Sequence, residues 1–478
     1  MYGDLMNREK KLFKNTFILS VGGITTKFIT FFLLPLYTKV LSTEEYGIVD
    51  LFNTLIYLLL PIVTLQVEQS VFRYLIDCRD SKKEKLEIIS TGFFTVLLQC
   101  LIFIIIFTPI SFFIKNEYKY FIMTNVISYI FVSLFQQIVR GLGDNKKYAI
   151  SGIISASFTI LFNLLFLLKL NLGGKGMLLG TLCGQIICMI YILLFGKIYN
   201  YINIKKFDKK VLKKLYSYSL PLIPNYISWW IFISSDRIIV SSILGLSMNG
   251  ILSASHKFSN FFTNVYNIFQ LGWDESISVH INDNDIDKYF NKMFNIVLYF
   301  FSSIIISIIA VMPLVYPILI DSKFGSGINL VPITLIGNIL SIIVALETAI
   351  YIGKKNTKII ANTAIVSSLI NIVVHLALIK YIGIYASVIS TVISYLFLGF
   401  YRYFDIKKKY FKITFDKLKT LFTLLILIIT LFIYYQNDII LTVINIIIVI
   451  VYDILLNKKE LGSIVGILKH KKSKTNAK

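Results

Sequence analysis

Charged residues are scarce in this 478-residue chain: Asp, Glu, Lys and Arg make up 15% of it, whereas a soluble domain carries about a quarter. Hydrophobic residues make up 56%, and the mean hydropathy is +0.74. One soluble core cannot bury an apolar surplus of this size, so lipid must solvate much of the chain. The short connections between apolar runs also leave no room for a sizeable soluble domain.

Cysteine and histidine are also rare, with four residues of each. The histidines are scattered and no pair of cysteines has metal-ligand spacing, so we expect no metal site and no cofactor. A nucleotide-binding loop is missing too, because Gly173–Gly176 lacks the spacing and the Ser or Thr after Lys that phosphate binding requires. No catalytic constellation is present, and we expect that the protein is not an enzyme. The cysteines, which we interpret as small buried hydrophobic residues, are Cys78, Cys100, Cys183 and Cys188.

The formal net charge is +22, but its distribution argues against a nucleic-acid partner. Basic residues occur in short clusters between apolar runs, the heaviest being Lys205–Lys214, Arg402–Lys419 and Lys458–Lys478. With the N-terminus inside, about 38 of the 48 Lys and Arg residues fall on the cytoplasmic side and about 7 outside. The positive-inside rule therefore predicts that both termini are cytoplasmic.

The apolar runs predict an all-α polytopic membrane protein with about fourteen transmembrane helices. The first run is too long for a signal peptide and lacks a small-residue cleavage site, so we interpret it as a retained span. The predicted spans are 14–38, 47–71, 88–111, 120–139, 148–168, 176–196, 217–244, 250–272, 293–320, 328–352, 359–379, 383–400, 417–435 and 439–456.

A weak internal repeat relates the first six spans to the next six. Val40–Ile48 aligns with Ile243–Ile251 at an offset of about 203 residues. Near the end of each half, Asn163 aligns with Asn371 in the same way. A row of small residues follows: Gly176, Gly180 and Gly184 align with Gly383, Ser387 and Thr391.

This repeat predicts three parts: an N-lobe over 1–200, a C-lobe over 201–410, and two extra helices with a basic tail over 411–478. Each lobe has an even number of spans, so both insert in the same orientation as a parallel repeat. The interface between such lobes is the natural place for a substrate path. The rows of small residues predict close helix packing inside each lobe.

Charges inside the predicted spans are the strongest functional signal. Each such charge costs roughly 2.5–3.5 kcal/mol on insertion scales, so it normally faces a bundle interior or an aqueous cavity. The basic candidates for substrate binding are Lys27, Arg237 and Lys257. The acidic candidates for ion coupling are Asp50, Glu68, Asp236 and Glu347.

Structural ion pairs or snorkelling side chains are the alternative explanation. Snorkelling suits Glu68, Arg73 and Arg140, which lie near cytoplasmic ends, but not Lys27 in the middle of its span. Adjacent residues on a helix point about 100° apart, so we expect that Asp236 and Arg237 do not simply neutralise each other.

The repeat favours function for the three basic residues. Lys27, Arg237 and Lys257 align with uncharged residues of the other half, whereas a purely architectural charge should recur in both halves.

A basic lumen of low dielectric selects an anion. Trp229 and Trp230 lie near these charges and can stack on sugar faces, or they can serve as interfacial anchors.

Several stretches resemble a known family. Pro35–Leu51 is similar to the first-helix signature of bacterial polysaccharide repeat-unit flippases, and Ser219–Asn225 with Ser235–Arg237 is similar to the matching signature of the second lobe. Asn249–Ile251 belongs to this second signature, and Ala254–Lys257 and Phe269–Trp273 continue the resemblance, although Gln270-Leu-Gly-Trp273 lacks the Ala that many members carry before the Trp.

The resemblance, over about residues 10–400, implies membership of the multidrug/oligosaccharidyl-lipid/polysaccharide (MOP) exporter superfamily. It implies alternating access in a bacterial cytoplasmic membrane, an undecaprenyl-diphosphate-linked oligosaccharide as cargo, and coupling to a proton or sodium gradient. It also implies membrane lipids, a polymerase and glycosyltransferases of the same pathway as partners. Lys27, Arg237 and Lys257 match positions where such proteins present lumen cations.

Two other functions stay open. A multidrug/cation antiporter of the same superfamily would fit the span count, but a basic lumen argues against it. A membrane polysaccharide polymerase or glycosyltransferase would be expected to show a long outer loop or an acidic catalytic motif, and the sequence has neither.

Overall fold

A computed structural model describes residues 31–113 and 116–458. Every regular element within these residues is a helix, and sixteen of them are α-helices, which confirms the predicted all-α polytopic class. The chain divides into two compact units, 1–253 and 254–478. The N-lobe, C-lobe and C-terminal helix pair defined by the repeat remain a prediction.

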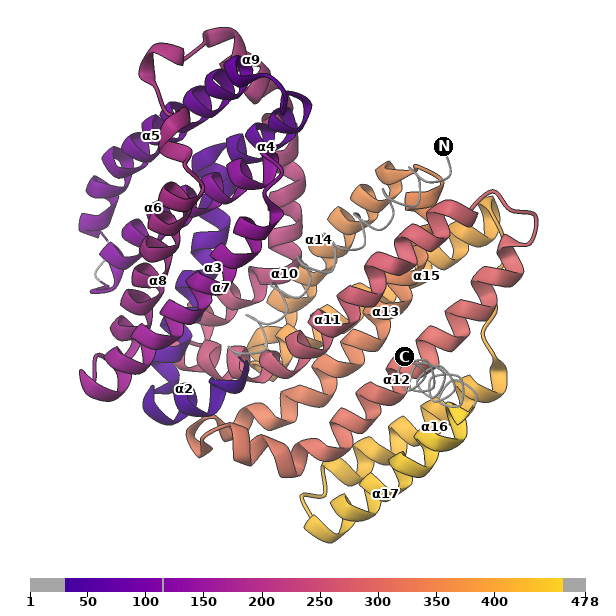
Figure 1. Ribbon diagram of the computed structural model, residues 1–478. Coiled ribbons are helices and arrows are strands. Elements are labelled where there is room, and N and C mark those ends of the chain that lie inside the picture. The colour runs from indigo at the N-terminus through magenta and orange to yellow at the C-terminus, as the bar shows by residue number, and fades with distance from the viewer. Residues whose placement is uncertain (1–30, 114–115, 459–478) are drawn as a thin grey trace, which may run out of the picture. The chain divides into compact units, whose positions relative to one another are not determined.

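Unit 1 is a bundle in which α7 and α8 make the most extensive contact and α6 packs on α8, α4 and α3 (Figure 1). The helix α10 packs along α3. The α-helices are α2 Leu34–Val40, α3 Thr43–Thr64, α4 Val67–Asp77, α5 Lys82–Phe113, α6 Lys119–Gly141, α7 Asn145–Leu164, α8 Gly173–Phe195, α9 Lys209–Ser219 and α10 Ile223–Ile243. Short 3-10 or π segments are η1 Leu165–Lys169, η2 Ile198–Tyr201, η3 Ile204–Lys206 and η4 Leu220–Leu222.

Small residues let α7 and α8 approach closely, as the sequence predicts. A Cβ added at Gly180 would lie 2.1 Å from Asn163 Oδ1, and one at Gly184 would lie 2.1 Å from Thr159 Oγ1. In unit 2 the amide of Asn371, the repeat partner of Asn163, donates to Thr391 Oγ1 at 3.2 Å. The predicted duplication itself stays a prediction.

The second predicted span, 47–71, is two helices rather than one. A capping box formed by Ser42 and Glu45 starts α3, which ends at Thr64, and α4 begins at Val67. Between them Leu65 and Gln66 have φ of 49° and 60°, values that L-residues with a side chain rarely adopt.

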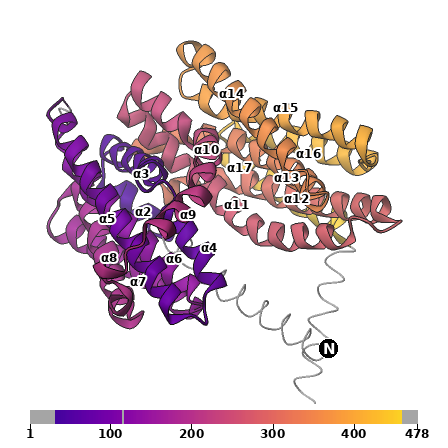
Figure 2. The same ribbon diagram turned by 90° about the horizontal axis from the view of Figure 1, so that it is seen from above.

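In unit 2, α12 packs on α13, α16 and α17, and the last two lie side by side along it (Figure 1). The pair α14 and α15 also lies side by side (Figure 2). The helices are α11 Leu246–His280, which begins in unit 1, α12 Ile286–Leu319, η5 Ser322–Leu330, α13 Val331–Gly353, α14 Thr357–Ile382, α15 Tyr385–Lys409, α16 Lys417–Tyr434 and α17 Ile439–Leu456.

Ten helical segments within the described residues are long and apolar enough to cross a membrane. Each predicted span from 47 onward falls on a helix, but α10, α11 and α15 are not among the ten because polar and charged residues lower their hydropathy. Most of the first predicted span, 14–38, lies outside the described residues. Sequence analysis did not predict α9, a short lysine-rich helix.

Candidate functional site: charges buried within the helices

An ion-pair cluster joins α3 and α10 in unit 1. Arg237 Nε lies 3.1 Å from Asp50 Oδ2, and Arg237 Nη1 lies 3.1 Å from Asp236 Oδ1. The side chains of Arg237, Asp50 and Asp236 are 12%, 15% and 9% exposed. Charge-assisted contacts of this kind are strong where water is scarce. Three of the predicted site residues therefore form one cluster.

The expectation that Asp236 and Arg237 do not neutralise each other is wrong. The Asp236 carboxylate turns back and also accepts the Arg237 backbone N–H at 2.9 Å. The long guanidinium side chain then reaches the same oxygen from the neighbouring position. Arg237 is thus a paired cation, and a ligand anion must compete with two carboxylates for it.

Two glycines bring the starts of α3 and α11 together just beside this cluster. A Cβ at Gly47 would lie 2.0 Å from the Leu246 carbonyl oxygen, and one at Gly250 would lie 2.0 Å from that of Thr43. The Asn249 amide donates to the Gly47 carbonyl at 2.9 Å. Gly47 and Gly250 are equivalent in the predicted repeat, so repeat-related positions contact each other.

The two predicted substrate-binding tryptophans differ in their surroundings. Trp230 donates its indole N–H to the Thr54 carbonyl at 3.0 Å, which ties α10 to α3 next to the ion-pair cluster. Trp229 is 43% exposed. Trp230 therefore has an architectural contact, whereas the Trp229 side chain presents open ring surface.

Glu68 lies in the first turn of α4 and is 1% exposed. The Thr64 side chain and the Glu68 backbone N–H lie near its carboxylate, and among the described residues no ion pair to it is found. The snorkelling interpretation of Glu68 is therefore wrong, because its carboxylate does not reach an exposed surface of the unit. It holds for Arg73, whose exposed side chain pairs with Asp77.

The other two basic residues predicted to bind substrate are Lys27 and Lys257. Lys27 lies outside the described residues. Lys257 is half-buried in the part of α11 that belongs to unit 2.

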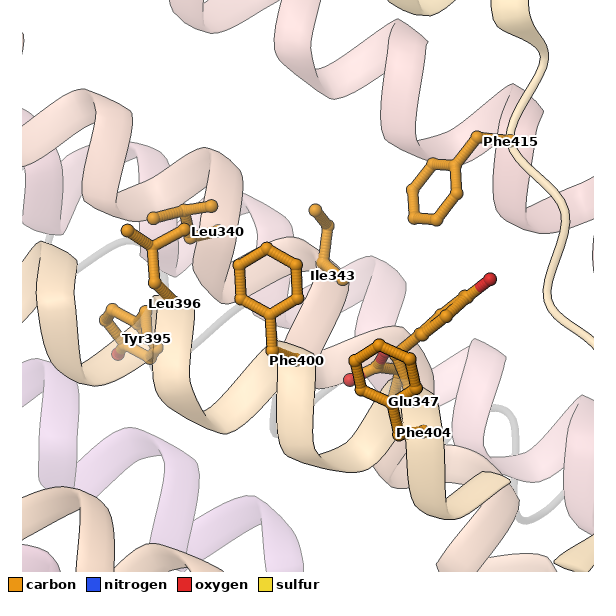
Figure 3. Close-up of a pocket in the computed structure, with 10 residues that line it drawn as sticks. Leu340, Ile343, Glu347, Tyr395, Leu396, Phe400, Phe404 and Phe415 are labelled. Carbon is orange, nitrogen blue, oxygen red and sulfur yellow. The ribbon is translucent and has the colours of Figure 1, made fainter. Parts of the chain in front are cut away.

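Glu347 lies at an apolar cavity of about 280 Å³ in unit 2. Figure 3 shows Leu340, Ile343 and Glu347 along α13, facing Tyr395, Leu396 and Phe400 of α15, with Phe415 across the cavity. Glu347 is fully buried, and its carboxylate oxygens have no hydrogen-bond partner among the residues that the structure describes. Such a carboxylate is a candidate for taking up a cation.

Sequence analysis missed Arg402, which it grouped with a cytoplasmic basic cluster. This residue is 1% exposed, and its guanidinium donates to the Thr348 hydroxyl at 2.6 Å and the Thr363 hydroxyl at 3.0 Å. Its charge acts on Glu347. A signal existed: Leu398, Arg402 and Ile406 are spaced four apart and share the buried face of α15.

Comparison with solved structures identifies the fold. The fold is similar to that of lipid II flippase MurJ in an inward closed conformation, with a TM-score of 0.70 and 17% identity over 94% of this chain and 100% of that one. It is also similar to a multidrug resistance MATE family transporter of the MOP superfamily in an inward-facing conformation. The TM-score is 0.62, with 14% identity over 82% of this chain and 99% of that one. The protein thus has the membrane-embedded fold of MOP superfamily transporters.

Sequence comparison gives the family. The model of the polysaccharide biosynthesis protein family matches residues 12–269, more than half of the chain. The chain belongs to this family. A relative, Lsg locus putative protein 1 of Haemophilus influenzae, is 36% identical over 64 residues, which is 13% of this chain and 16% of that protein. The match spans about a sixth of that relative's length.

Proposed function

We propose that the protein is a flippase that moves undecaprenyl-diphosphate-linked oligosaccharide repeat units from the cytoplasmic to the outer leaflet by alternating access, for surface polysaccharide assembly. The observation that carries the proposal is the likeness to a lipid II flippase over 94% of the chain, in a protein that belongs to a polysaccharide biosynthesis family. About fourteen spans in two six-helix lobes plus a C-terminal pair are part of this proposal.

The Arg237 cluster supports a role in handling the anionic head of the cargo. A diphosphate can gain the guanidinium only by displacing Asp50 or Asp236 or by joining them. Neutralisation of one carboxylate by a proton or sodium ion would favour that exchange. In this mechanism Lys27 and Lys257 also bind the diphosphate during its passage, and Trp229 and Trp230 stack on its sugars.

The matched variants Arg237→Gln and Arg73→Gln test this role. Both remove an arginine that pairs with aspartate, but Arg237 is nearly buried and Arg73 is exposed. We expect Arg237→Gln to reduce flipping of diphosphate-linked glycan at least about tenfold, the effect of about 1.4 kcal/mol, while Arg73→Gln flips normally. Protein abundance and unfolding temperature are measured in parallel. Normal flipping by a stable Arg237→Gln protein would exclude this residue from cargo handling.

The multidrug antiporter remains the second candidate because the fold is also that of MATE transporters. Cells that lack the protein would then lose resistance to cationic drugs and keep surface polysaccharide. The flippase proposal expects the reverse pattern.

A further inference from the structure

An apolar groove of about 570 Å³ lies between α3 and α5 in unit 1, and Tyr216 of α9 lines one end of it. We call it the α3–α5 groove. Its volume is that of a small-molecule binding site. It is open on one side, where Ile62, Ile102 and Ile106 are 44%, 46% and 55% exposed. Both α3 and α5 are long and apolar enough to cross a membrane, so bilayer hydrocarbon surrounds the open side.

The helix α9 packs on α5 and runs beside it in the same direction. Asp208, which caps α9, donates its backbone N–H to Thr91 Oγ1 at 3.0 Å, and the Gln99 amide donates to the Tyr216 hydroxyl at 3.3 Å. Eight residues, or about 12 Å, separate these two contacts on each helix. The groove continues along α5 for about 16 Å more, from Gln99 to Ile110. That length is about half the hydrocarbon thickness of a bilayer, the depth of one leaflet.

The polar end of the groove has hydrogen-bonding capacity that the protein does not use. Gln99 is 8% exposed, and its side-chain oxygen has no hydrogen-bond partner within the described residues. The Tyr216 hydroxyl accepts from the Gln99 amide, which leaves the hydroxyl proton to donate. Buried polar groups are nearly always satisfied. A ligand that brings ester oxygens, with their bound water, to this depth would satisfy both side chains.

Basic side chains of α9 lie directly before this polar end. The helix has no acidic residue, and its exposed basic residues are Lys209, Lys210, Lys213 and Lys214. In the part of the chain that the structure describes, none of the four pairs with a carboxylate. Lys209, Lys213 and Tyr216 are spaced four and three apart, so they share one face of α9. Positive charge, polar pair and apolar groove thus follow one another in the order of phosphate, ester and acyl chain in a phospholipid.

We propose that α9 and the α3–α5 groove form a binding site for an anionic phospholipid of the bilayer. Its phosphate lies at Lys209 and Lys213, its glycerol ester lies at Tyr216, and one acyl chain fills the groove. Lysines beside a membrane attract anionic headgroups, and their long stems let the ammonium groups reach them. The bound lipid would hold α9, and the start of α10 that follows it, against α3 and α5. This site is independent of the proposed cargo.

The test is thermal unfolding of lipid-depleted full-length protein in detergent, with added phosphatidylglycerol or phosphatidylcholine of the same acyl chains. We expect phosphatidylglycerol to raise the unfolding temperature in a saturable manner, since a ligand that binds the native state stabilises it. Phosphatidylcholine should bind at least about tenfold more weakly. Glycerol 3-phosphate, which has no acyl chain, should give no rise. Equal responses to the two phospholipids would mean contact with bulk lipid only and would overturn the site.

Variants of the groove test the place of the acyl chain. Ile106→Trp fills the groove and should weaken phosphatidylglycerol binding at least about tenfold. Ile105→Trp adds the same side chain at a neighbouring position that is 70% exposed and does not line the groove, and it should keep the wild-type response. Equal affinities in the two variants would exclude the groove as the binding place.

Variants of α9 test the headgroup and decide the matter if Ile106→Trp does not fold. Lys209→Gln/Lys213→Gln should lower the affinity for phosphatidylglycerol to that for phosphatidylcholine. Lys408→Gln/Lys412→Gln removes two exposed lysines at the same spacing in unit 2 and should keep the preference. An unchanged preference in a folded Lys209→Gln/Lys213→Gln protein would contradict the proposal.

Undecaprenyl phosphate in the same titration separates a phospholipid from the tail of the proposed cargo. We expect it not to displace phosphatidylglycerol. Stabilisation by undecaprenyl phosphate alone would make the groove a site for the cargo tail, and the phospholipid assignment would be wrong. Flipping is a separate measurement, so a lost lipid response with normal flipping would remove this site and leave the flippase function.

Discussion

Single buried charges in this protein are held as much by neutral oxygen atoms as by opposite charges. Arg237 contacts two carboxylates, whereas Arg402 is held by the hydroxyls of Thr348 and Thr363. The charge of Arg402 acts on Glu347, whose carboxylate makes no hydrogen bond within the described part of the chain. The buried charges of Arg402 and Glu347 therefore compensate each other only in part. Removal of either side chain would leave the charge of the other without this compensation.

Removal of Arg402 should be strongly destabilising. We expect Arg402→Met to lower the free energy of unfolding by about 3–5 kcal/mol, because Glu347 is left as an uncompensated buried charge. The double variant Arg402→Met/Glu347→Gln should recover part of this loss. Arg73→Met, at an exposed position, should stay within about 0.5 kcal/mol of wild type. Denaturant unfolding in detergent gives the comparison, and additive effects in the double variant would show that the two charges do not interact.

Most residues of the candidate site could be predicted because a charge stands out in an apolar run. Asp50, Asp236 and Arg237 are nearly buried, and Glu68 and Glu347 are fully buried. Their partners could not be predicted, since Asp50 and Arg237 are 187 residues apart in sequence. Arg402 was hidden for another reason: it begins a stretch rich in lysine that resembles a cytoplasmic loop.

At the scale of elements, hydropathy located the helices but not their interruptions. Apolar residues recur on both sides of Leu65 and Gln66, and the fall in hydropathy from α3 to α4 does not by itself indicate a break in the backbone. The amphipathic helix α9 was missed because its four lysines suggested a loop. Close packing was easier to predict, since glycine spacing on α8 indicates a tight contact with α7.

Gly47 marks a close helix contact in unit 1. We expect Gly47→Ala to lower the free energy of unfolding by about 1–3 kcal/mol, because the new methyl group would overlap the Leu246 carbonyl of α11. The matched control is Gly152→Ala on α7, where a Cβ meets nothing within 4 Å. That substitution should be neutral or stabilising by up to about 1 kcal/mol. Equal unfolding temperatures for the two variants would show that the α3–α11 contact is not tight.

At the scale of the whole molecule, composition and charge distribution predicted an all-α polytopic membrane protein. The likeness to the MOP transporter fold confirms this class, and the family match confirms the predicted polysaccharide family. The orientation of the termini and the division into lobes stay predictions, since they concern the membrane and the repeat rather than the packing of individual helices. The coupling ion and the cargo are likewise proposals that rest on the buried charges.

The central claim is that this chain flips lipid-linked glycan, and reconstitution tests it most directly. Purified protein is placed in proteoliposomes with an undecaprenyl-diphosphate-linked oligosaccharide, and a membrane-impermeant glycan-modifying enzyme reports how much cargo becomes accessible outside. We predict cargo exposure that increases with the amount of protein and is lost in Arg237→Gln. Exposure no greater than in protein-free vesicles, from protein with a native unfolding transition, would contradict the proposed function.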